Sequence, residues 1–445
     1  MALSLGQKAG WGLADMGVVI FVIVKQLLIV AYLTSYLGVP VGLAGLVTTA
    51  VLIFDMITDP LIGHFSDRTQ SRFGRRAPWM FVGVLVMSAG MVGLFSVPAG
   101  FGTAGNLTWV VAFFVLATVG FTMIAIPYSA QSGEITTDPK ERSAMTGWRM
   151  AFASIGILVG GALLPGLAVS MGYAKAAAAV VPLMIAAVWV SIWATRHAPR
   201  VEHAATVSLR ESFGVVFANR AFVVLVLIYG VMTLAIALIT AGLPFATQYL
   251  VVDNGNTALS GAASALSVLS LMFACFVVGA ILSQAIWVLL SYRLGKAPAL
   301  ILGLSLYVVL LIVLYQALPS VNVTIIAGLF AIAGVTNGAY QQIPWAMYPD
   351  LMDITRRETG LTVEGAFTAV WLFGQKLANA VAPAVLGFVL AAAGWQETTD
   401  GTVAQSPEAL VALQWAITLV PAGILVVAIL GLGVIYRPMA VRALA

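Results

Sequence analysis

Long apolar stretches recur along this chain, and they constrain its fold more than any other feature. We place about twelve of them, each near the roughly 20 residues that a helix needs to cross a bilayer. Hydrophobic residues make up 61% of the 445 residues and charged residues only 9%, which excludes a soluble globule with a charged surface. Backbone groups in lipid must be hydrogen-bonded internally, and spans of this length achieve this as helices. We therefore expect an all-α integral membrane protein with twelve transmembrane helices.

The basic residues alternate between the loops that separate these stretches. They gather in every second loop and in the tail, and include Arg68, Arg72, Arg75, Arg76, Arg196, Arg293, Lys296, Arg356 and Arg437. Loops rich in Lys and Arg stay in the cytoplasm. The first apolar run, residues 11–36, is too long for a signal-peptide core and is interpreted as a retained span. The pattern predicts a multi-pass protein of the cell (inner) membrane with both termini in the cytoplasm.

The chain divides into two groups of six spans that look related. The longest polar stretch, residues 196–220, is expected to be a cytoplasmic loop between an N-terminal bundle, 1–195, and a C-terminal bundle, 221–445. IPYSAQSGEITTD, starting at Ile126, resembles IPWAMYPDLMDIT, starting at Ile343, and SRFGRRAP (71–78) is echoed by YRLGKAP (292–298). Two related halves of six helices are typical of transporters whose substrate site lies near the middle of the membrane.

Two carboxylates lie four residues apart in the second span, in FDMITDP (54–60). Asp55 and Asp59 share a helix face, with roughly 6 Å between their stems. At an effective dielectric of about 20, two full charges at that distance repel by about 3 kcal/mol. A proton or a small hard cation such as Na⁺ would remove this repulsion, and Thr58 and Thr122 could supply further oxygen ligands. The alternative is that both acids pair with arginines of the bundle.

Other charges in the spans are candidate substrate contacts, because an ionisable group in a bilayer is costly without a partner or a water-filled cavity. Lys25 lies about halfway along the first span, and Lys376 lies well inside the eleventh. A salt bridge to a carboxylate of the second span is the alternative for Lys25. Arg149 either contacts substrate or anchors the end of the fifth span. Asp15 either caps or tethers the first helix or takes part in gating.

Aromatic and amide side chains complete the candidate substrate site. Tyr128, Tyr340, Trp345 and Trp371 lie on spans that also carry polar residues, and Gln341 follows Tyr340. Their rings could stack on a substrate ring, although anchoring at the membrane interface is the commoner fate of Trp and Tyr.

Catalytic and metal-binding patterns are missing from the sequence. Cys275 is the single cysteine, the three histidines have no ligand spacing, and no Ser/His/Asp set, phosphate loop or nucleic-acid motif is visible. We expect a protein that is not an enzyme, with no cofactor, no metal beyond a coupling Na⁺, and no nucleic-acid partner.

Three segments resemble the glycoside-pentoside-hexuronide:cation symporter family, a branch of the major facilitator superfamily that includes the melibiose permease. They are KAGWGLADMG (8–17), FDMITDPLIGHFSDRTQSRFGRRAPWMFVG (54–83) and PYSAQSGEITTDPKERSAMTGWRMAFAS (127–154). The resemblance is strong over the N-terminal half and continues more thinly to the eleventh helix. It implies the major facilitator fold, with two pseudo-symmetric six-helix halves.

The resemblance implies roles for several residues. The family's cation site matches Asp55, Asp59 and Thr122, and its asparagine ligand for sodium is replaced by Thr58. The family's helix-five arginine matches Arg149, and its helix-eleven lysine matches Lys376.

The permease's galactoside-binding residues are replaced. Its two galactoside-binding aspartates align with Val19 and Ala125 here, and its tryptophan aligns with Ser129. A galactoside is therefore not expected, and the added Lys25 favours an anionic ligand.

The expected function is symport of a sugar or glycoside, including an anionic one such as a hexuronide, coupled to Na⁺ or H⁺ through alternating access. The resemblance also implies that the loop Arg68 to Arg76, with Asp67, Arg72 and Arg75, forms cytoplasmic charge contacts that hold the outward-open state, and Asp15 is a separate gating candidate. The expected partners are the small-molecule substrate and the lipid bilayer, and the protein is expected to be a monomer. An alternative with the same fold is a transporter of lysolipids or other amphiphiles.

Overall fold

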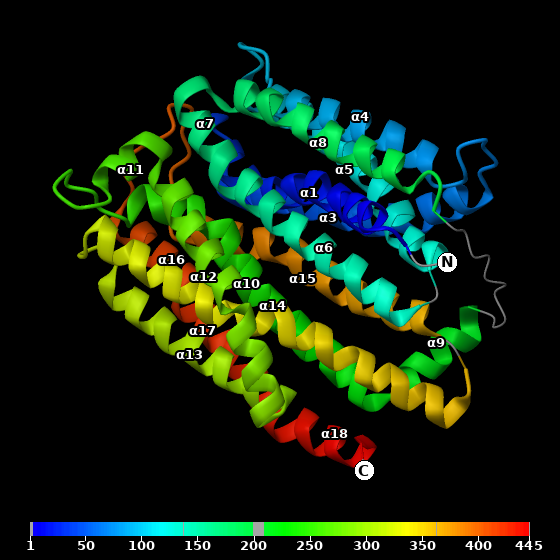
Figure 1. The fold of residues 1–445 in the computed structure, drawn as a ribbon. Helices are drawn as coiled ribbons and strands as arrows, with labels where there is room; N and C mark the ends of the chain where they lie inside the picture. Colours follow the sequence, from blue (N-terminus) through cyan, green and yellow to red (C-terminus); the bar gives the residue numbers. More distant parts are fainter. Residues whose placement is uncertain (1–2, 137, 199–208, 362, 445) are drawn as a thin grey trace. The chain divides into compact units, whose positions relative to one another are not determined.

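The computed structural model describes residues 3–136, 138–198, 209–361 and 363–444. Within these ranges the chain is helical apart from short connections (Figure 1). Twelve of its helices or helix runs are long and apolar enough to cross a membrane. The predicted all-α membrane fold with twelve spans is confirmed.

The chain forms two compact units. Unit 1 comprises Met1–Ala204, Ala262–Leu271 and Glu397–Val403, and unit 2 comprises Ala205–Gly261, Met272–Gln396 and Ala404–Ala445. Each is described here by itself. The division falls within the segment 196–220 that was expected to be a loop. That segment also contains a helix, α9 (Leu209–Ala218).

The helices before α9 supply most of unit 1 (Figure 1). They are α1 (Leu5–Leu27), α2 (Ile29–Tyr36), α3 (Val41–Arg68), α4 (Ala77–Leu94), α5 (Gly102–Ile135), α6 (Pro139–Leu158), the π-helical turn η1 (Val159–Leu163), α7 (Leu164–Met171) and α8 (Tyr173–Thr195). The first span is broken at Leu28 into α1 and α2, and the fifth runs through α6, η1 and α7.

The helices after α9 are longer on average and supply most of unit 2. They are α10 (Arg220–Tyr249), α11 (Ser260–Leu266), α12 (Val268–Leu294), α13 (Lys296–Ala317), α14 (Val323–Thr359), α15 (Glu364–Ala392), α16 (Pro407–Ile417), α17 (Leu419–Leu430), the π-helical turn η2 (Gly431–Tyr436) and α18 (Arg437–Leu444). Its longest helix, α14, contains Pro344 and Pro349. Prolines are tolerated inside membrane helices because neighbouring helices and side chains satisfy the freed backbone groups.

Glycines let α1 approach α6 closely enough for their polar side chains to meet. A Cβ atom at Gly12 would lie 2.7 Å from the backbone nitrogen of Arg149, and one at Gly156 would lie 2.6 Å from the carbonyl oxygen of Met16. Neither distance is possible for a real side chain, so only glycine permits this separation of the two backbones. The close packing sets the positions of Asp15 on α1 and Arg149 on α6.

A short segment between α15 and α16 belongs to unit 1, although both of those helices belong to unit 2. In this segment, Glu397–Val403, the backbone N–H of Thr398 donates to the carbonyl of Thr34 at 3.0 Å, and that of Gly401 donates to the carbonyl of Ser35 at 2.8 Å. The N–H of Gly38 donates in turn to the carbonyl of Thr398 at 3.1 Å. These bonds satisfy carbonyls in the last turn of α2, which have no partner within the helix.

Candidate functional site

A buried ion pair in unit 1 joins the first two spans. Lys25 on α1 places its Nζ 3.2 Å from Oδ2 of Asp55 on α3. The other carboxylate oxygen, Oδ1, accepts a hydrogen bond of 2.7 Å from the hydroxyl of Thr122 on α5. Lys25 is 5% exposed, Asp55 2% and Thr122 0%. Three helices therefore meet at one carboxylate whose two oxygens are both engaged.

Aromatic rings enclose the same ammonium group. Nζ of Lys25 lies 4.1 Å from the ring centroid of Phe121 and 5.7 Å from that of Phe21. A cation over an aromatic face is stabilised by the negative potential of the ring. The Lys25 ammonium is thus held by a carboxylate and by two rings in a site from which water is excluded.

The other two predicted cation ligands, Thr58 and Asp59, follow on α3. The Thr58 hydroxyl donates to the backbone carbonyl of Asp55 at 3.0 Å, within its own helix. Asp59 lies one turn beyond Asp55 and is half-buried. The structure therefore brings Asp55 and Thr122 into contact, as expected for a shared site, while the Thr58 hydroxyl is engaged by its own backbone.

A second ion pair links α1 to α6. Nε of Arg149 lies 3.1 Å from Oδ2 of Asp15, and the guanidinium carbon lies 5.4 Å from the ring centroid of Tyr128. Tyr128 stacks on Trp11, with centroids 4.7 Å apart. The side chain of Arg149 is 33% exposed, whereas that of Asp15 is 6% exposed. Of the two cations Lys25 and Arg149, only Arg149 is accessible.

Unit 2 contains a group of uncharged side chains that we call the aromatic cluster. It consists of the rings of Tyr229, Tyr340, Trp345 and Trp371 and the hydroxyl of Thr233. The ring of Tyr229 on α10 stacks on that of Trp371 on α15, with centroids 4.2 Å apart and planes 12° apart. The indole N–H of Trp345 donates to the Tyr229 hydroxyl at 3.2 Å. The hydroxyls of Thr233 and Tyr340 lie 2.9 Å apart.

Sequence reasoning missed Tyr229 and Thr233 in this cluster. Both lie in an otherwise apolar helix, VVLVLIYGVMTLAIALIT (223–240), where single tyrosines and threonines are common. No signal in the sequence distinguishes them from packing or interface residues.

The remaining predicted substrate residues of unit 2 lie near the cluster in sequence. Gln341 donates from Nε2 to Oδ1 of Asn337, one turn earlier on α14, at 3.1 Å. Lys376 is half-buried on α15. It follows Trp371 by five residues, which places it about 140° around the helix axis. Trp371 and Lys376 therefore do not share a helix face.

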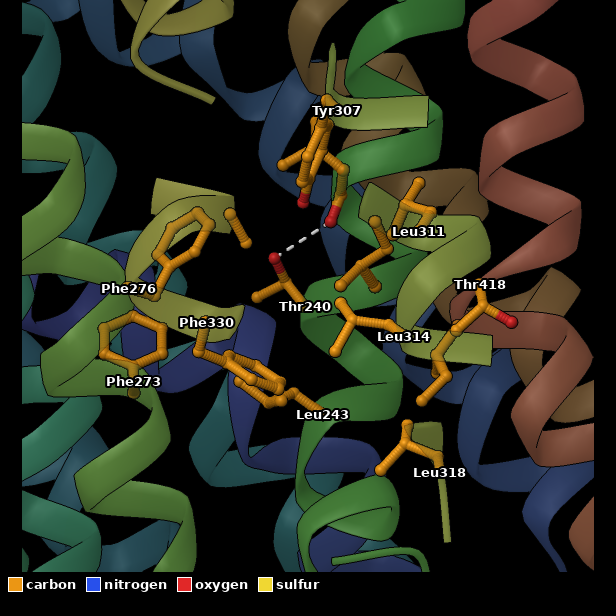
Figure 2. Close-up of a pocket in the computed structure, with 14 residues that line it drawn as sticks. Thr240, Leu243, Phe273, Phe276, Tyr307, Leu311, Leu314, Leu318, Phe330 and Thr418 are labelled. Atoms are coloured by element: carbon orange, nitrogen blue, oxygen red, sulfur yellow. Dashed lines mark hydrogen bonds between the residues drawn. The ribbon is translucent and has the colours of Figure 1, made fainter. Parts of the chain in front are cut away.

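A cavity of about 50 Å³ lies inside unit 2, among α10, α12, α13, α14 and the break between α16 and α17 (Figure 2). Its lining is apolar apart from Thr240, Tyr307 and Thr418, and the Thr240 hydroxyl is bonded to the carbonyl of Ile236 at 2.9 Å. Small-molecule sites usually have several hundred Å³. This cavity is therefore too small and too apolar to be the sugar site.

The predicted gating loop forms one ion-pair network at the start of α4. Arg76 donates from Nε and Nη2 to Oε1 of Glu134 at 3.0 and 2.8 Å, and Nη2 of Arg75 lies 3.1 Å from the same oxygen. Arg72 instead lies over the ring of Phe73, with its guanidinium carbon 4.8 Å from the centroid.

Two other predicted gating residues take no described part in this network. Arg68 is exposed at the end of α3. The side chain of Asp67 lies outside the described residues. The predicted loop, Arg68 to Arg76, includes Arg76, whereas sequence reasoning missed its partner Glu134.

Unit 2 repeats this arrangement at the matching motif. Lys296, which begins α13, places Nζ 2.6 Å from Oδ2 of Asp350 near the end of α14. Arg76 and Lys296 are equivalent when SRFGRRAP and YRLGKAP are aligned on their shared Ala-Pro. The internal repeat could have indicated both basic residues.

A family model described as MFS/sugar transport protein matches residues 10–437. This chain belongs to that family. The family consists of transporters and not enzymes. The predicted family resemblance, fold and multi-pass membrane character are therefore confirmed.

Curated relatives of the family carry several names. The chain is 24% identical over 400 residues, 87% of this chain and 83% of the relative, to a putative glycoside/cation symporter, YagG, of Escherichia coli strain K12. It is 26% identical to a putative sulfoquinovose importer of Salmonella typhimurium, over 98% of this chain and 90% of the relative. It is 23% identical to the sodium-dependent lysophosphatidylcholine symporter 1-A of Danio rerio, over 85% and 75%.

A solved structure supports the fold alone. An auto-inhibited POT family peptide transporter aligns with a TM-score of 0.65 at 13% identity, over 99% of this chain and 97% of that chain. At family level, the comparisons support symport of a sugar with a cation.

Proposed function

We propose that this protein carries a sugar or glycoside across the cell (inner) membrane together with a cation, Na⁺ or H⁺, by alternating access of its two halves. The observation that carries the proposal is the contact of Thr122 with Asp55. Both residues match the family's cation positions, and they are 67 residues apart in sequence yet share a hydrogen bond. A buried carboxylate in a membrane helix is costly and is retained where ions or protons are handled.

The aromatic cluster supports a sugar as substrate. The ring of Trp345, which is 37% exposed, suits the apolar C–H face of a pyranose, whereas Trp371 is fully buried and stacks with Tyr229 and Tyr348. The hydroxyls and indole N–H groups of the cluster suit the hydroxyls of the sugar. Within the described residues the indole N–H of Trp371 has no hydrogen-bond partner, although its nitrogen is buried. An unpaired buried donor costs about 1–3 kcal/mol, and a substrate oxygen would remove that cost.

An anionic sugar is the proposed substrate class. Arg149 is an accessible cation within a candidate membrane span of unit 1, and a guanidinium matches a carboxylate or sulfonate with two parallel hydrogen bonds. Lys376, half-buried in unit 2, is the second candidate. The name of one relative, a putative sulfoquinovose importer, supports the same class, because sulfoquinovose is a sulfonated sugar. The role of Lys25 as a substrate contact stays a prediction, but its burial and its pairing with Asp55 favour the different role argued below.

Coupling would follow from the two-way linkage of binding. Proton or cation occupancy at Asp55 and Asp59 would change the charge balance around the Lys25–Asp55 pair and raise substrate affinity, by a typical 1–3 kcal/mol. Substrate would raise cation affinity by the same factor. We expect the charge pairs at the starts of α4 and α13 to be cytoplasmic contacts that are remade as the halves move, and we expect the protein to act as a monomer.

Uptake by purified protein in proteoliposomes tests the proposal. The vesicles receive labelled glucuronate, a sulfonated sugar and a neutral glycoside, with pH and Na⁺ gradients imposed separately. We expect accumulation of an anionic sugar with one gradient and its loss in Asp59→Asn. Arg149→Lys serves as the matched variant, since it keeps the charge and removes the planar donor pair. Accumulation that persists unchanged in Asp59→Asn would refute the cation-site assignment.

A lysolipid is the alternative substrate, because one relative is named a sodium-dependent lysophosphatidylcholine symporter. A phosphate headgroup would also suit Arg149. Uptake of labelled lysophosphatidylcholine in the same vesicles separates the two substrates. Transport of the lysolipid without transport of any sugar would replace the first proposal by the second.

A further inference from the structure

A sodium ion needs several oxygen ligands around one open position. The oxygens expected to supply them are those of Asp55, Asp59, Thr58 and Thr122. In this structure a lysine side chain reaches the same carboxylate that the family pattern assigns to the cation. The basic group is Lys25, from the first span, 30 residues before Asp55.

The contacts of Asp55 leave little room for a metal ion. Oδ2 accepts from the Lys25 ammonium at 3.2 Å, and Oδ1 accepts from the Thr122 hydroxyl at 2.7 Å. A sodium ion bound to Oδ2 would therefore lie within a few ångströms of a second positive charge.

Lys25 cannot easily leave this position. Its side chain is 6% exposed, and its ammonium packs over the rings of Phe121 and Phe21. Moving a charged amine away from its carboxylate would leave two uncompensated charges in the membrane interior. The pair is thus held together by the cost of separating it.

We infer that Lys25 is a built-in cation that takes the place of Na⁺ at Asp55, so that this transporter neither binds nor requires Na⁺. The inference rests on the proposed function in one respect, since it concerns the ion of the proposed symport. It leaves H⁺ as the coupling ion of the two that were expected. Lys25 is then the residue that determines ion selectivity.

Sodium binding is measured without any sugar, on purified protein exchanged into choline chloride. The unfolding temperature is followed as NaCl replaces choline chloride at constant ionic strength, and binding of radioactive ²²Na⁺ is measured in parallel. We expect wild type to show no shift that is specific to Na⁺ and no saturable binding. Lys25→Met should gain both, because Asp55 is then a buried carboxylate with room beside it for a cation.

Matched variants separate this role from a merely structural one. Lys25→Arg keeps a cation and should stay indifferent to Na⁺. Lys296→Met removes a paired lysine elsewhere in the chain and should gain no Na⁺ response. In the double variant Lys25→Met/Asp55→Asn the response should be lost again. Lys25→Gln, whose amide can still donate to Asp55, replaces Lys25→Met if the latter does not fold.

Two results of these binding measurements would overturn the inference: saturable Na⁺ binding by wild type, or folded Lys25→Met and Lys25→Gln that both ignore Na⁺. Because neither readout involves a sugar, failure to transport any sugar would refute the proposed function and leave this result standing. Conversely, sugar uptake by wild type that requires Na⁺ would refute the inference and uphold the symport.

Discussion

The two units place polar groups in the membrane by different means. Unit 1 holds full charges in pairs, the buried Lys25 with the buried Asp55 and the partly exposed Arg149 with the buried Asp15. Unit 2 instead has neutral rings and hydroxyls in its aromatic cluster, where Tyr229, Trp345 and Trp371 bond and stack on one another. Charged groups are costly to bury but respond strongly to an ion, whereas neutral groups suit a polar, uncharged ring. The contrast suggests a division of labour, with the ion handled in unit 1 and the sugar ring held in unit 2.

The same units resemble each other at the starts of α4 and α13. Arg76 pairs with Glu134, and Lys296 pairs with Asp350, each linking the start of one helix to the end of the next. The side chain of Arg76 is 10% exposed, whereas that of Lys296 is 38% exposed. Both copies of the repeat therefore contain an ion pair, but the pair of Arg76 is more deeply buried than that of Lys296. The two pairs should contribute different amounts to the free energy of unfolding.

The largest effect is expected from Asp55→Ala. The change leaves the Lys25 ammonium buried without its carboxylate, and removing one partner of a buried pair costs about 3–5 kcal/mol. We expect a large fall in unfolding temperature and loss of gradient-driven accumulation. Denaturation of the purified protein in detergent measures the first, and vesicle uptake measures the second.

The double variant Lys25→Met/Asp55→Asn provides the control for Asp55→Ala. It removes both charges and should recover most of the stability without recovering coupling. If Asp55→Ala were as stable as wild type, the pair would not be the central charge interaction of unit 1.

A smaller loss in the free energy of unfolding is expected from Arg76→Gln. Hydrogen bonds between charged groups contribute about 1.5–3 kcal/mol, and Arg76 makes two to Glu134 and one to Ser66. Chemical unfolding of the wild type and the variant gives the difference. Arg72→Gln is the matched control, because Arg72 lies in the same loop and contacts Phe73 instead; equal losses in the two variants would contradict a specific role for the Arg76 pair.

Both substrate affinity and stability should fall in Trp371→Phe. The substitution keeps a ring for stacking on Tyr229 and removes an indole N–H that has no partner within the described residues. One lost hydrogen bond to substrate corresponds to about 0.5–1.5 kcal/mol, or up to roughly tenfold in affinity. The half-saturating sugar concentration should rise, and the unfolding temperature should fall moderately, because Trp371 is fully buried and the smaller ring leaves a void. An unchanged half-saturating concentration would indicate that the indole does not contact the sugar.

The smallest effect is expected from Lys296→Gln. Exposed ion pairs contribute about 0–1 kcal/mol, and the side chains of Lys296 and Asp350 are 38% and 42% exposed. Unfolding curves recorded in low and high salt should nearly coincide for the wild type and the variant. A loss in stability as large as that of Arg76→Gln would contradict the expected difference between the Arg76–Glu134 and Lys296–Asp350 pairs.

Much of the fold was predictable because hydropathy reports directly on membrane spans. The twelve spans and the position of the central division follow from apolar length and from one polar stretch. The α9 helix inside that stretch was not predicted, because its ten residues carry no span-like signal. The break of the first span at Leu28 also lies in an unbroken apolar run, so nothing in the sequence marks it.

The site was predictable only where one residue type carries a strong energetic cost. Asp55 and Asp59 were identifiable because two adjacent acids in a span are costly. For Lys25, the structure shows the alternative that the sequence offered, a salt bridge to a carboxylate of the second span, but the sequence alone does not choose between Asp55 and Asp59. Tyr229 was missed because a tyrosine in an apolar helix costs little and therefore carries little information.

The segment Glu397–Val403 has a consequence for dissecting the gene. Because this stretch and Ala262–Leu271 both belong to unit 1, the two units are not two consecutive lengths of chain. A cut in the central linker would produce a first fragment that lacks both segments and leaves the carbonyls of Thr34 and Ser35 without their donors. When the two fragments are co-expressed, the second fragment would have to supply both segments before unit 1 is complete. The first fragment would therefore not fold fully before it meets the second.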